Sequence, residues 1–123
     1  MSEVVVLGAS NRPDRYAFMC MTILAEMGHT VIPVNPRETM VMGHYCYHNL
    51  RDLIKDHPVI DTLTIYVNPD ISAKLDQDII ELNPKRVIFN PGSENHHLQK
   101  ILEEKKIKCL EACTLVMLRT GQF

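Results

Sequence analysis

Residues 3–34 have the sequence EVVVLGASNRPDRYAFMCMTILAEMGHTVIPV. The segment begins with a continuous apolar run over residues 3–7, which is typical of a strand buried on both faces of a parallel sheet. After a polar turn, apolar residues recur at spacings of three and four from Tyr16 to Met27, which predicts an amphipathic helix closed by Gly28. A second apolar run covers residues 30–34. Strand, helix and strand in about 30 residues predict a βαβ unit with a right-handed crossover.

The rest of the chain continues this alternation. Further strands are expected at residues 61–67, 86–89 and 108–110, with a short extended piece at 43–47. Helices are expected at residues 50–54, at 69–82 after the start signal Asn68-Pro69, from the turn at 91–94 through Glu104, and at 114–119. Strands that alternate with helices predict an α/β fold: a Rossmann-like, doubly wound, mainly parallel five-stranded sheet with helices on both faces.

Length and composition limit the organisation and the partners. The chain has 123 residues, and a domain typically has roughly 100–200 residues, so residues 1–123 are expected to form a single domain. With 46% hydrophobic and 23% charged residues, the composition is that of a globular protein. The formal net charge of −2 provides no bulk positive field for nucleic acid or an anionic membrane. Any bound anion must therefore be held by a few local residues.

The chain shows no targeting or membrane signal. No window reaches the ~18 consecutive apolar residues of a spanning helix, and the N-terminal residues lack the pattern of a signal peptide. We therefore expect a cytoplasmic protein. The four cysteines form no C-x-x-C pair and lie among apolar residues, which favours reduced thiols. Cys113 precedes the last expected helix, so a nucleophilic thiol and a packing role are both compatible with its position, and packing is favoured.

His44, Cys46 and His48 alternate along an extended segment, so their side chains would share one face. At about 3.3 Å per residue the two histidines are roughly 13 Å apart. That is too far for one Zn²⁺ with bonds of ~2.0–2.3 Å, and no metal site is predicted.

The candidate site follows from the predicted sheet. In open α/β sheets, ligands bind outside the carboxyl ends of the strands, where the strand order reverses. Four turns are expected there, at residues 8–15, 35–37, 67–69 and 90–94. The first is a candidate phosphate site, because Gly8 permits a tight turn and the N–H groups at the start of the next helix point at an anion. Ser10 adds a hydroxyl.

The nature of the ligand depends on two positions. Only the first glycine of the dinucleotide motif G-x-G-x-x-G is present, so an ordinary turn between strand and helix remains an alternative for residues 8–13. The second strand is followed by Asn35, Pro36 and Arg37, with no carboxylate before Glu38. A cation at this place favours a phosphorylated ribose. NADP, with a 2′-phosphate, and coenzyme A (CoA), with a 3′-phosphate, both fit.

A set of motifs carries a resemblance to a known family. The motifs are GAS at 8–10 with Pro13, Arg15 and Tyr16 after it, GH at 28–29, PVNP at 33–36, YVNP at 66–69, KRVIFNPG at 85–92 and ACTLVML at 112–118. Together they resemble the small stand-alone CoA-binding proteins, a family similar to the N-terminal CoA-binding domain of the succinyl-CoA synthetase α subunit. The resemblance extends from about Val4 to Phe123.

The resemblance implies a Rossmann-like domain that binds CoA or an acyl-CoA across the strand ends. By position, it assigns the phosphates to Gly8, Ala9 and Ser10 with Arg12 or Arg15, and the ribose and its phosphate to Asn35, Pro36 and Arg37. It assigns the adenine side to Val67, Asn68 and Pro69, and the pantetheine arm to Asn90, Pro91, Gly92 and Ser93. Ser93 stands where the family pattern has Thr.

The resemblance carries no catalytic residue into this chain. The phosphorylated histidine of the synthetase belongs to a second domain that these 123 residues do not contain, so we expect a CoA carrier, sensor or regulatory module without catalytic machinery of its own. One alternative is a small NADP-dependent oxidoreductase, for which the sequence offers no evident acid or base. Another is the nucleotide-binding subunit of a multi-chain acyl-CoA ligase. A second copy of the chain or a separate catalytic chain stays open as a partner.

Overall fold

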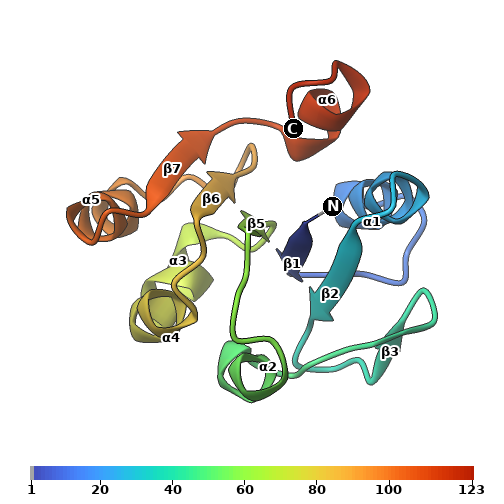
Figure 1. The fold of residues 1–123 in the computed structure, drawn as a ribbon, viewed down its shortest axis with the longest axis horizontal. Helices are drawn as coiled ribbons and strands as arrows, with labels where there is room; N and C mark the ends of the chain where they lie inside the picture. Colours follow the sequence, from blue (N-terminus) through green and yellow to red (C-terminus); the bar gives the residue numbers. More distant parts are fainter. Residues whose placement is uncertain (1) are drawn as a thin grey trace.

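A computed structural model describes residues 2–123 and has a five-stranded sheet at its centre (Figure 1). The strands are β1 (Glu3–Leu7), β2 (Thr30–Val34), β5 (Thr62–Ile65), β6 (Arg86–Phe89) and β7 (Lys108–Glu111). Their order is β2-β1-β5-β6-β7, and all neighbouring pairs are parallel. The predicted parallel, doubly wound α/β fold is thereby confirmed.

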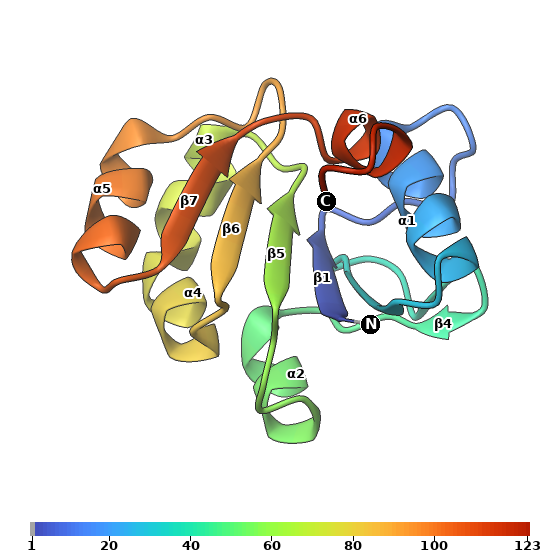
Figure 2. The same cartoon turned by 45° about the horizontal axis from the view of Figure 1, so that its top comes forward.

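The strand order reverses between β1 and β5. From β1 the chain goes outward to β2, then returns across β1 to form β5, β6 and β7 on the other side. The loops that leave β1 and β5 therefore diverge at the carboxyl ends of these strands, which all point to the same edge of the sheet (Figure 2). This topological switch point is where open α/β sheets have a crevice.

Helices cover both faces of the sheet. Helices α1 (Tyr16–Glu26) and α6 (Thr114–Arg119) lie on one face, and α2 (Leu50–Asp56), α4 (Asp76–Leu82) and α5 (His96–Glu104) lie on the other (Figure 1). Alternate residues of β1 serve the two cores: Val4 and Val6 pack toward α1, and Val5 packs toward the opposite helices. All three valines are fully buried. The two-sided burial explains the unbroken apolar run in the sequence.

One predicted helix is wrong in its continuity. Residues 69–82 form α3 (Pro69–Ser72), a 3₁₀ turn (Ala73–Leu75) and α4 instead of a single helix. Ser72 is buried, and its hydroxyl accepts a hydrogen bond of 3.0 Å from the Asn95 amide at the start of α5. This long-range contact fixes α3 separately from α4. The strand expected at 61–67 is also shorter, because the chain turns at Tyr66 and Val67 to pack against Gly8.

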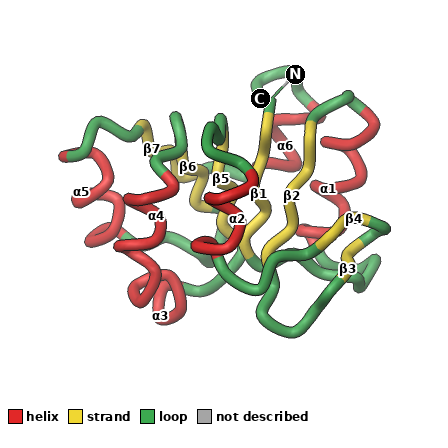
Figure 3. Tube along the Cα trace, turned by 60° about the horizontal axis from the view of Figure 1, so that its bottom comes forward, coloured by secondary structure: helices red, strands yellow, loops and turns green. Residues whose placement is uncertain are grey.

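The β2 edge of the sheet is partly covered. The extended piece expected at 43–47 belongs to a small antiparallel hairpin of β3 (Met40–Val41) and β4 (His44–Tyr45), which lies beside β2 (Figure 3). Tyr47 then pairs with β2: its N–H donates to the Pro33 carbonyl at 3.0 Å, and its carbonyl accepts from the Asn35 N–H at 2.9 Å. The opposite edge strand, β7, has Lys108 and Glu111 at its two ends.

Among residues 2–123, no helix combines the length and the apolar character needed to span a bilayer. All four cysteines are free thiols; Cys20 and Cys46 are buried, and Cys113 is half-buried at the residue preceding α6. The described part of the chain contains no cluster of three or more His, Cys, Asp or Glu side chains suited to a metal ion.

Candidate functional site

A cleft of about 570 Å³ lies at the switch point, between the loops that follow β1 and β2. We call it the carboxyl-edge cleft. Its lining residues are Gly8, Ala9, Ser10, Asn11, Arg12, Arg15, Tyr16, Ala17, Asn35, Arg37, Glu38, Tyr66 and Pro91. Its volume is within the range of clefts that bind small molecules, so this is the first place to examine for a ligand.

Gly8 shapes the floor of the cleft. Its φ is +90°, and a Cβ at this position would lie 3.0 Å from Val67 Cγ1 and 3.2 Å from the carbonyl carbon of Tyr66. The turn after β1 therefore passes directly against the chain leaving β5, which a side chain would prevent. The N–H groups of Gly8 and Ala9 both donate to the Val34 carbonyl, at 3.0 and 3.2 Å. These two N–H groups hold the turn and are not available to an anion.

The start of α1 faces the cleft without a side-chain cap. Asn49, Asn68 and Asn95 cap α2, α3 and α5 with their side chains, whereas no side chain caps α1. The residues at its start, Arg15 and Tyr16, line the cleft. The first N–H groups of a helix have no partner within the helix, and the helix dipole makes this end positive. An anion in the cleft is therefore favoured here.

Three arginines add positive charge to the cleft. Arg12 and Arg15 come from the loop after β1, and Arg37 comes from the loop after β2; all three are exposed. Arg12 lies 3.5 Å from the Asp14 carboxylate, but both side chains are largely exposed, so this pair is easily exchanged for a ligand anion. The acidic residue of the lining, Glu38, accepts a hydrogen bond of 3.1 Å from the Asn11 amide. With three arginines and one glutamate, the lining of the cleft has a positive net charge.

Two asparagines fix the loops that bear these charges. Asn11 also donates to the Met40 carbonyl at 2.9 Å and accepts from the Met42 N–H at 3.1 Å, which ties the first loop to the β3–β4 hairpin. The Asn35 amide donates to the Ala9 carbonyl at 2.8 Å and accepts from the Arg37 N–H at 2.8 Å. Asn35 therefore acts as a brace that sets the position of Arg37. A site held in this way is organised before a ligand arrives.

Tyr66 contributes an unpaired polar atom. Its hydroxyl is buried and makes no hydrogen bond to any group of residues 2–123. Burial, together with the Cys20 thiol nearby, raises the pKa of Tyr66 far above its ordinary value, so the hydroxyl keeps its proton. A buried hydroxyl without a partner is uncommon in proteins, and this one belongs to a residue of the cleft lining.

The structure brings eight of the fifteen predicted site residues together in the cleft: Gly8, Ala9, Ser10, Arg12, Arg15, Asn35, Arg37 and Pro91. The other seven, which are Pro36, Val67, Asn68, Pro69, Asn90, Gly92 and Ser93, do not line it.

Several of these seven have internal partners in the structure. The Asn90 amide donates to Thr64 Oγ1 at 2.7 Å and to the Ile65 carbonyl at 2.9 Å, and its oxygen accepts from the Thr114 N–H at 2.8 Å. The Ser93 hydroxyl donates to the Asn90 carbonyl at 2.7 Å, and the Asn68 side chain caps α3. Asn90 thereby joins β5, β6 and the start of α6.

Sequence reasoning missed five lining residues, which are Asn11, Tyr16, Ala17, Glu38 and Tyr66. Three of them lie in or directly after the predicted phosphate turn, so the whole segment 8–17 was the better candidate. Glu38 follows Arg37 in the chain, and its hydrogen bond with Asn11 holds it at the cleft. Tyr66 lies within the strand predicted at 61–67, and it reaches the cleft because β5 ends at Ile65.

The fold and this cleft define a Rossmann-like α/β domain with its cleft at the topological switch point. The sequence matches the family CoA_binding_2, described as a CoA binding domain, over residues 2–119, and the chain belongs to this family. The resemblance found from the motifs is thereby confirmed.

Relatives of this chain are similar over most of its length. It is 26% identical to the uncharacterized protein YneT of Bacillus subtilis (strain 168) over 103 residues, which cover 84% of this chain and 74% of YneT. The crystal structure of an uncharacterized protein has a TM-score of 0.89 and 39% identity, with 100% of this chain and 98% of that chain covered.

A second similar structure belongs to a much longer chain. The dinucleotide forming acetyl-coenzyme A synthetase 1 of Ca. Korarchaeum cryptofilum has a TM-score of 0.71 and 23% identity, over 90% of this chain and 25% of that chain. This likeness concerns the fold alone.

Proposed function

We propose that this protein binds CoA or an acyl-CoA in the carboxyl-edge cleft and acts in the cytoplasm as a carrier, sensor or regulatory module without catalytic machinery of its own. Membership of the CoA binding domain family supports the choice of ligand. The observation that carries the proposal is the uncapped start of α1, which opens onto a cleft lined by three arginines. Together these groups suit a ligand with several phosphates.

Each part of the cleft suits one part of CoA. The diphosphate is assigned to the first turn of α1 with Arg12 or Arg15, and the ribose 3′-phosphate to Arg37. The assignments of the adenine side to residues 67–69 and of the pantetheine arm to residues 90–93 belong to the same proposal, and Pro91 is the member of these segments that lines the cleft. Bound CoA supplies a thiol that carries acyl groups as thioesters.

The lining of the cleft supports a binding role. Among the described residues that line it there is no histidine, and Glu38 is engaged by Asn11. The Tyr66 hydroxyl keeps its proton because of its burial. A hydride-transfer enzyme needs an acid or base close to the reacting carbon, and these groups are poorly suited to that role.

Thermal unfolding with CoA, dephospho-CoA, NADP and NAD tests the ligand. A ligand at 100 times its dissociation constant adds about 2.7 kcal/mol to the free energy of unfolding, so binding is visible as a higher Tm. We expect CoA to raise the Tm most and dephospho-CoA to raise it less. The proposal is overturned if NADP or NAD raises the Tm and CoA does not. Native mass spectrometry of the purified protein would identify an acyl group on a co-purified ligand.

The substitution Arg37→Ala tests the ribose phosphate site. We expect a loss of roughly tenfold in CoA affinity, because a charge-assisted hydrogen bond is removed, and little difference between CoA and dephospho-CoA in the variant. The matched control is Arg119→Ala, which removes an exposed arginine that does not line the carboxyl-edge cleft. Isothermal titration calorimetry gives both affinities. Equal CoA affinity in the two variants would remove Arg37 from the site.

A further inference from the structure

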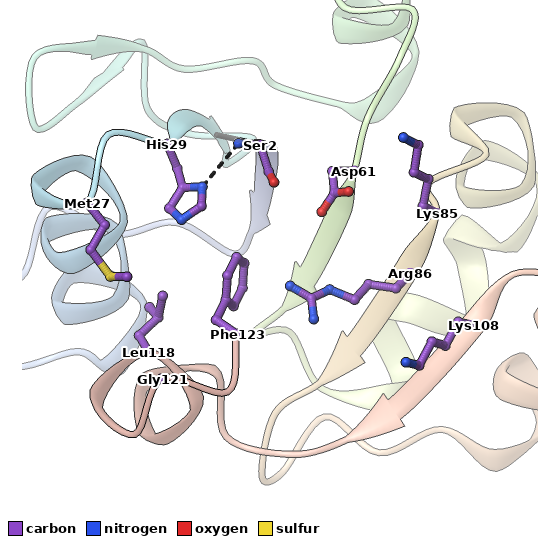
Figure 4. Close-up of a pocket in the computed structure, with 10 residues that line it drawn as sticks. All are labelled: Ser2, Met27, His29, Asp61, Lys85, Arg86, Lys108, Leu118, Gly121 and Phe123. Carbon is purple, nitrogen blue, oxygen red and sulfur yellow. Dashed lines mark hydrogen bonds between the residues drawn. The ribbon is translucent and has the colours of Figure 1, made fainter.

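A second pocket, of about 510 Å³, lies at the opposite edge of the sheet, where the strands begin (Figure 4). We call it the amino-edge pocket. Its polar side holds Asp61, Lys85, Arg86 and Lys108, which come from the first residues of β5, β6 and β7 or from the residue just before them. It shares no lining residue with the carboxyl-edge cleft.

Arg86 is held in the middle of this pocket. It is half-buried; its Nε donates to Thr62 Oγ1 at 2.8 Å, and the guanidinium carbon lies 4.3 Å from the centre of the Phe123 ring. Thr62 in turn donates to Asp61 Oδ2 at 2.7 Å. These contacts fix the plane of the guanidinium, and Figure 4 shows the side chain extended from β6 toward Phe123.

The terminal nitrogens of Arg86 have no anionic partner. Within residues 2–123, the Arg86 side chain makes no ion pair and no hydrogen bond besides the one to Thr62. Burial lowers the pKa of Arg86, and Asp61 nearby opposes this effect. The half-buried guanidinium thus keeps donors that an anion entering the pocket can engage with charge-assisted hydrogen bonds.

Two lysines flank Arg86. Lys85 precedes it in the chain, and Lys108 pairs with it in the register of β6 and β7. Neither lysine makes an ion pair within the described residues. The pocket thus gathers three cations around one carboxylate, although the whole chain has a net charge of −2. A ligand with two negative charges would neutralise the pocket.

The other side of the pocket is apolar. Met27 at the end of α1, Leu118 of α6 and Phe123 form this wall, and half of the Met27 surface is exposed. In Figure 4 the Phe123 ring lies between Arg86 and the side chains of Met27 and Leu118. The pocket therefore has a cationic half and an apolar half that meet at one aromatic ring.

We propose that the amino-edge pocket is a second binding site, which takes a small organic dianion with a short apolar part. The two negative charges, from a phosphomonoester or a dicarboxylate, bind to Arg86, Lys85 and Lys108. The apolar part lies against Phe123. The proposal is independent of CoA binding at the opposite edge of the sheet.

Titration with four aromatic probes, followed by ¹⁵N–¹H NMR, tests the site. Phenyl phosphate and phthalate are dianions of the two candidate kinds, benzoate is a monoanion, and phenol is neutral. We expect at least one dianion to shift the amides of residues 85–86, 108 and 121–123, with benzoate at least about tenfold weaker if it loses one charged contact. Phenol should cause no saturable shift. Which of the two dianions binds more tightly identifies the kind of ligand.

Two variants and one control assign the shifts to the pocket. Lys108→Ala and Arg86→Lys should each weaken binding of the dianion by roughly tenfold, the second because lysine lacks the planar fork of arginine. Lys74→Ala, which removes an exposed lysine outside the pocket, should bind as the unaltered protein does. Lys108 is exposed, so its variant decides the question even if Arg86→Lys does not fold.

The proposal is overturned if neither dianion shifts these amides, if the shifts occur at residues 8–17 instead, or if phenol binds as tightly as the dianions. Equal affinities of the Lys108→Ala and Lys74→Ala variants would overturn it as well.

Discussion

The two edges of the same sheet collect positive charge in different ways. The carboxyl-edge cleft of about 570 Å³ carries three arginines on loops, and the amino-edge pocket of about 510 Å³ carries its cations at the start of two strands and just before one of them. The loop cations lie around a helix start, whereas at the strand starts one cation, Arg86, lies over the aromatic ring of Phe123. Anion binding should therefore depend partly on backbone N–H groups in the cleft and on side chains alone in the pocket.

The direction of the helices explains this difference. In a parallel α/β sheet the helices begin near the carboxyl edge and end near the amino edge, as α1 and α5 do here (Figure 2). Helix starts are positive and helix ends are negative. The carboxyl edge thus gains part of its anion affinity from backbone N–H groups. At the amino edge, side chains must supply all of the anion affinity. Binding there should change when a charged side chain is replaced, whereas binding at the carboxyl edge should change when the backbone conformation is altered.

The largest effect is expected from Gly8→Ala. An L-residue with φ near +90° is strained, and its Cβ would lie 3.0 Å from Val67 Cγ1. Strain and overlap together should lower the free energy of unfolding by about 3–4 kcal/mol and should abolish CoA binding. Urea unfolding and calorimetric titration with CoA measure the two effects.

Gly121→Ala is the matched control at the amino edge. Gly121 has φ of +72°, but no atom lies within 4 Å of the position of an added Cβ. Strain alone should lower the free energy of unfolding by about 1–2 kcal/mol and leave CoA binding intact. If Gly8→Ala loses no more stability than Gly121→Ala, the close approach of the loops after β1 and β5 does not add to the cost of a side chain at position 8.

A smaller effect is expected from Asn90→Ala. The substitution removes three buried hydrogen bonds, which join β5 and β6 to the start of α6. We expect the free energy of unfolding to fall by about 2–3 kcal/mol, since buried groups lose their partners. Thr62→Val, which removes one contact of the half-buried Arg86 at the amino edge, should lower it by only about 1 kcal/mol. If urea unfolding shows the same loss of stability for both variants, the hydrogen bonds of Asn90 do not stabilise the protein more than that between Thr62 and Arg86.

The last effect concerns alkaline pH. Burial raises the pKa of Cys20, next to Tyr66, from 9.0 to about 11. Below pH 9 the thiol is neutral in both states; between about pH 9 and 11 the unfolded chain loses this proton first, so the free energy of unfolding falls as pH rises. One pKa unit corresponds to about 1.4 kcal/mol, so the loss should reach about 2 kcal/mol by pH 11.

Urea unfolding between pH 8 and 11 checks this expectation. Cys20→Ala should flatten the fall in stability, whatever its cost at neutral pH. Burial also raises the pKa of Cys109, beside Lys108, to about 11, but Cys109 is only half-buried, so Cys109→Ala should flatten it less. An unchanged slope in Cys20→Ala would show that this thiol does not set the alkaline limit.

Much of the fold could be predicted because burial leaves a plain signal. The two-sided burial of β1 produces an unbroken apolar run, and Gly28 and Pro69 mark where helices end and begin. The break between α3 and α4 could not be predicted, because it depends on the contact of Ser72 with Asn95, 23 residues away. The sequence around residues 69–82 contains no signal for a contact with a residue so far along the chain.

The location of the candidate site could be predicted in outline from the sheet topology. Topology alone places the ends of β1 and β2 together, so the loops at Gly8 and Arg37 were expected to meet. The use of each polar group depends on partners far apart in the chain: the Gly8 N–H is taken by Val34, and Asn90 is taken by Thr64 and Thr114. The position of a residue in a motif does not show whether its side chain is free to contact a ligand or is hydrogen-bonded within the protein.

The unequal edges of the sheet have a consequence for solubility. Tyr47 occupies hydrogen-bonding groups of β2, whereas β7 presents a free row of backbone donors and acceptors on its outer side. Such a row invites a strand from another molecule, and proteins resist this with short strands and charged ends. Strand β7 has four residues and begins with Lys108 and ends with Glu111. Lys108 therefore places a charge at the exposed edge of the sheet and also lines the amino-edge pocket.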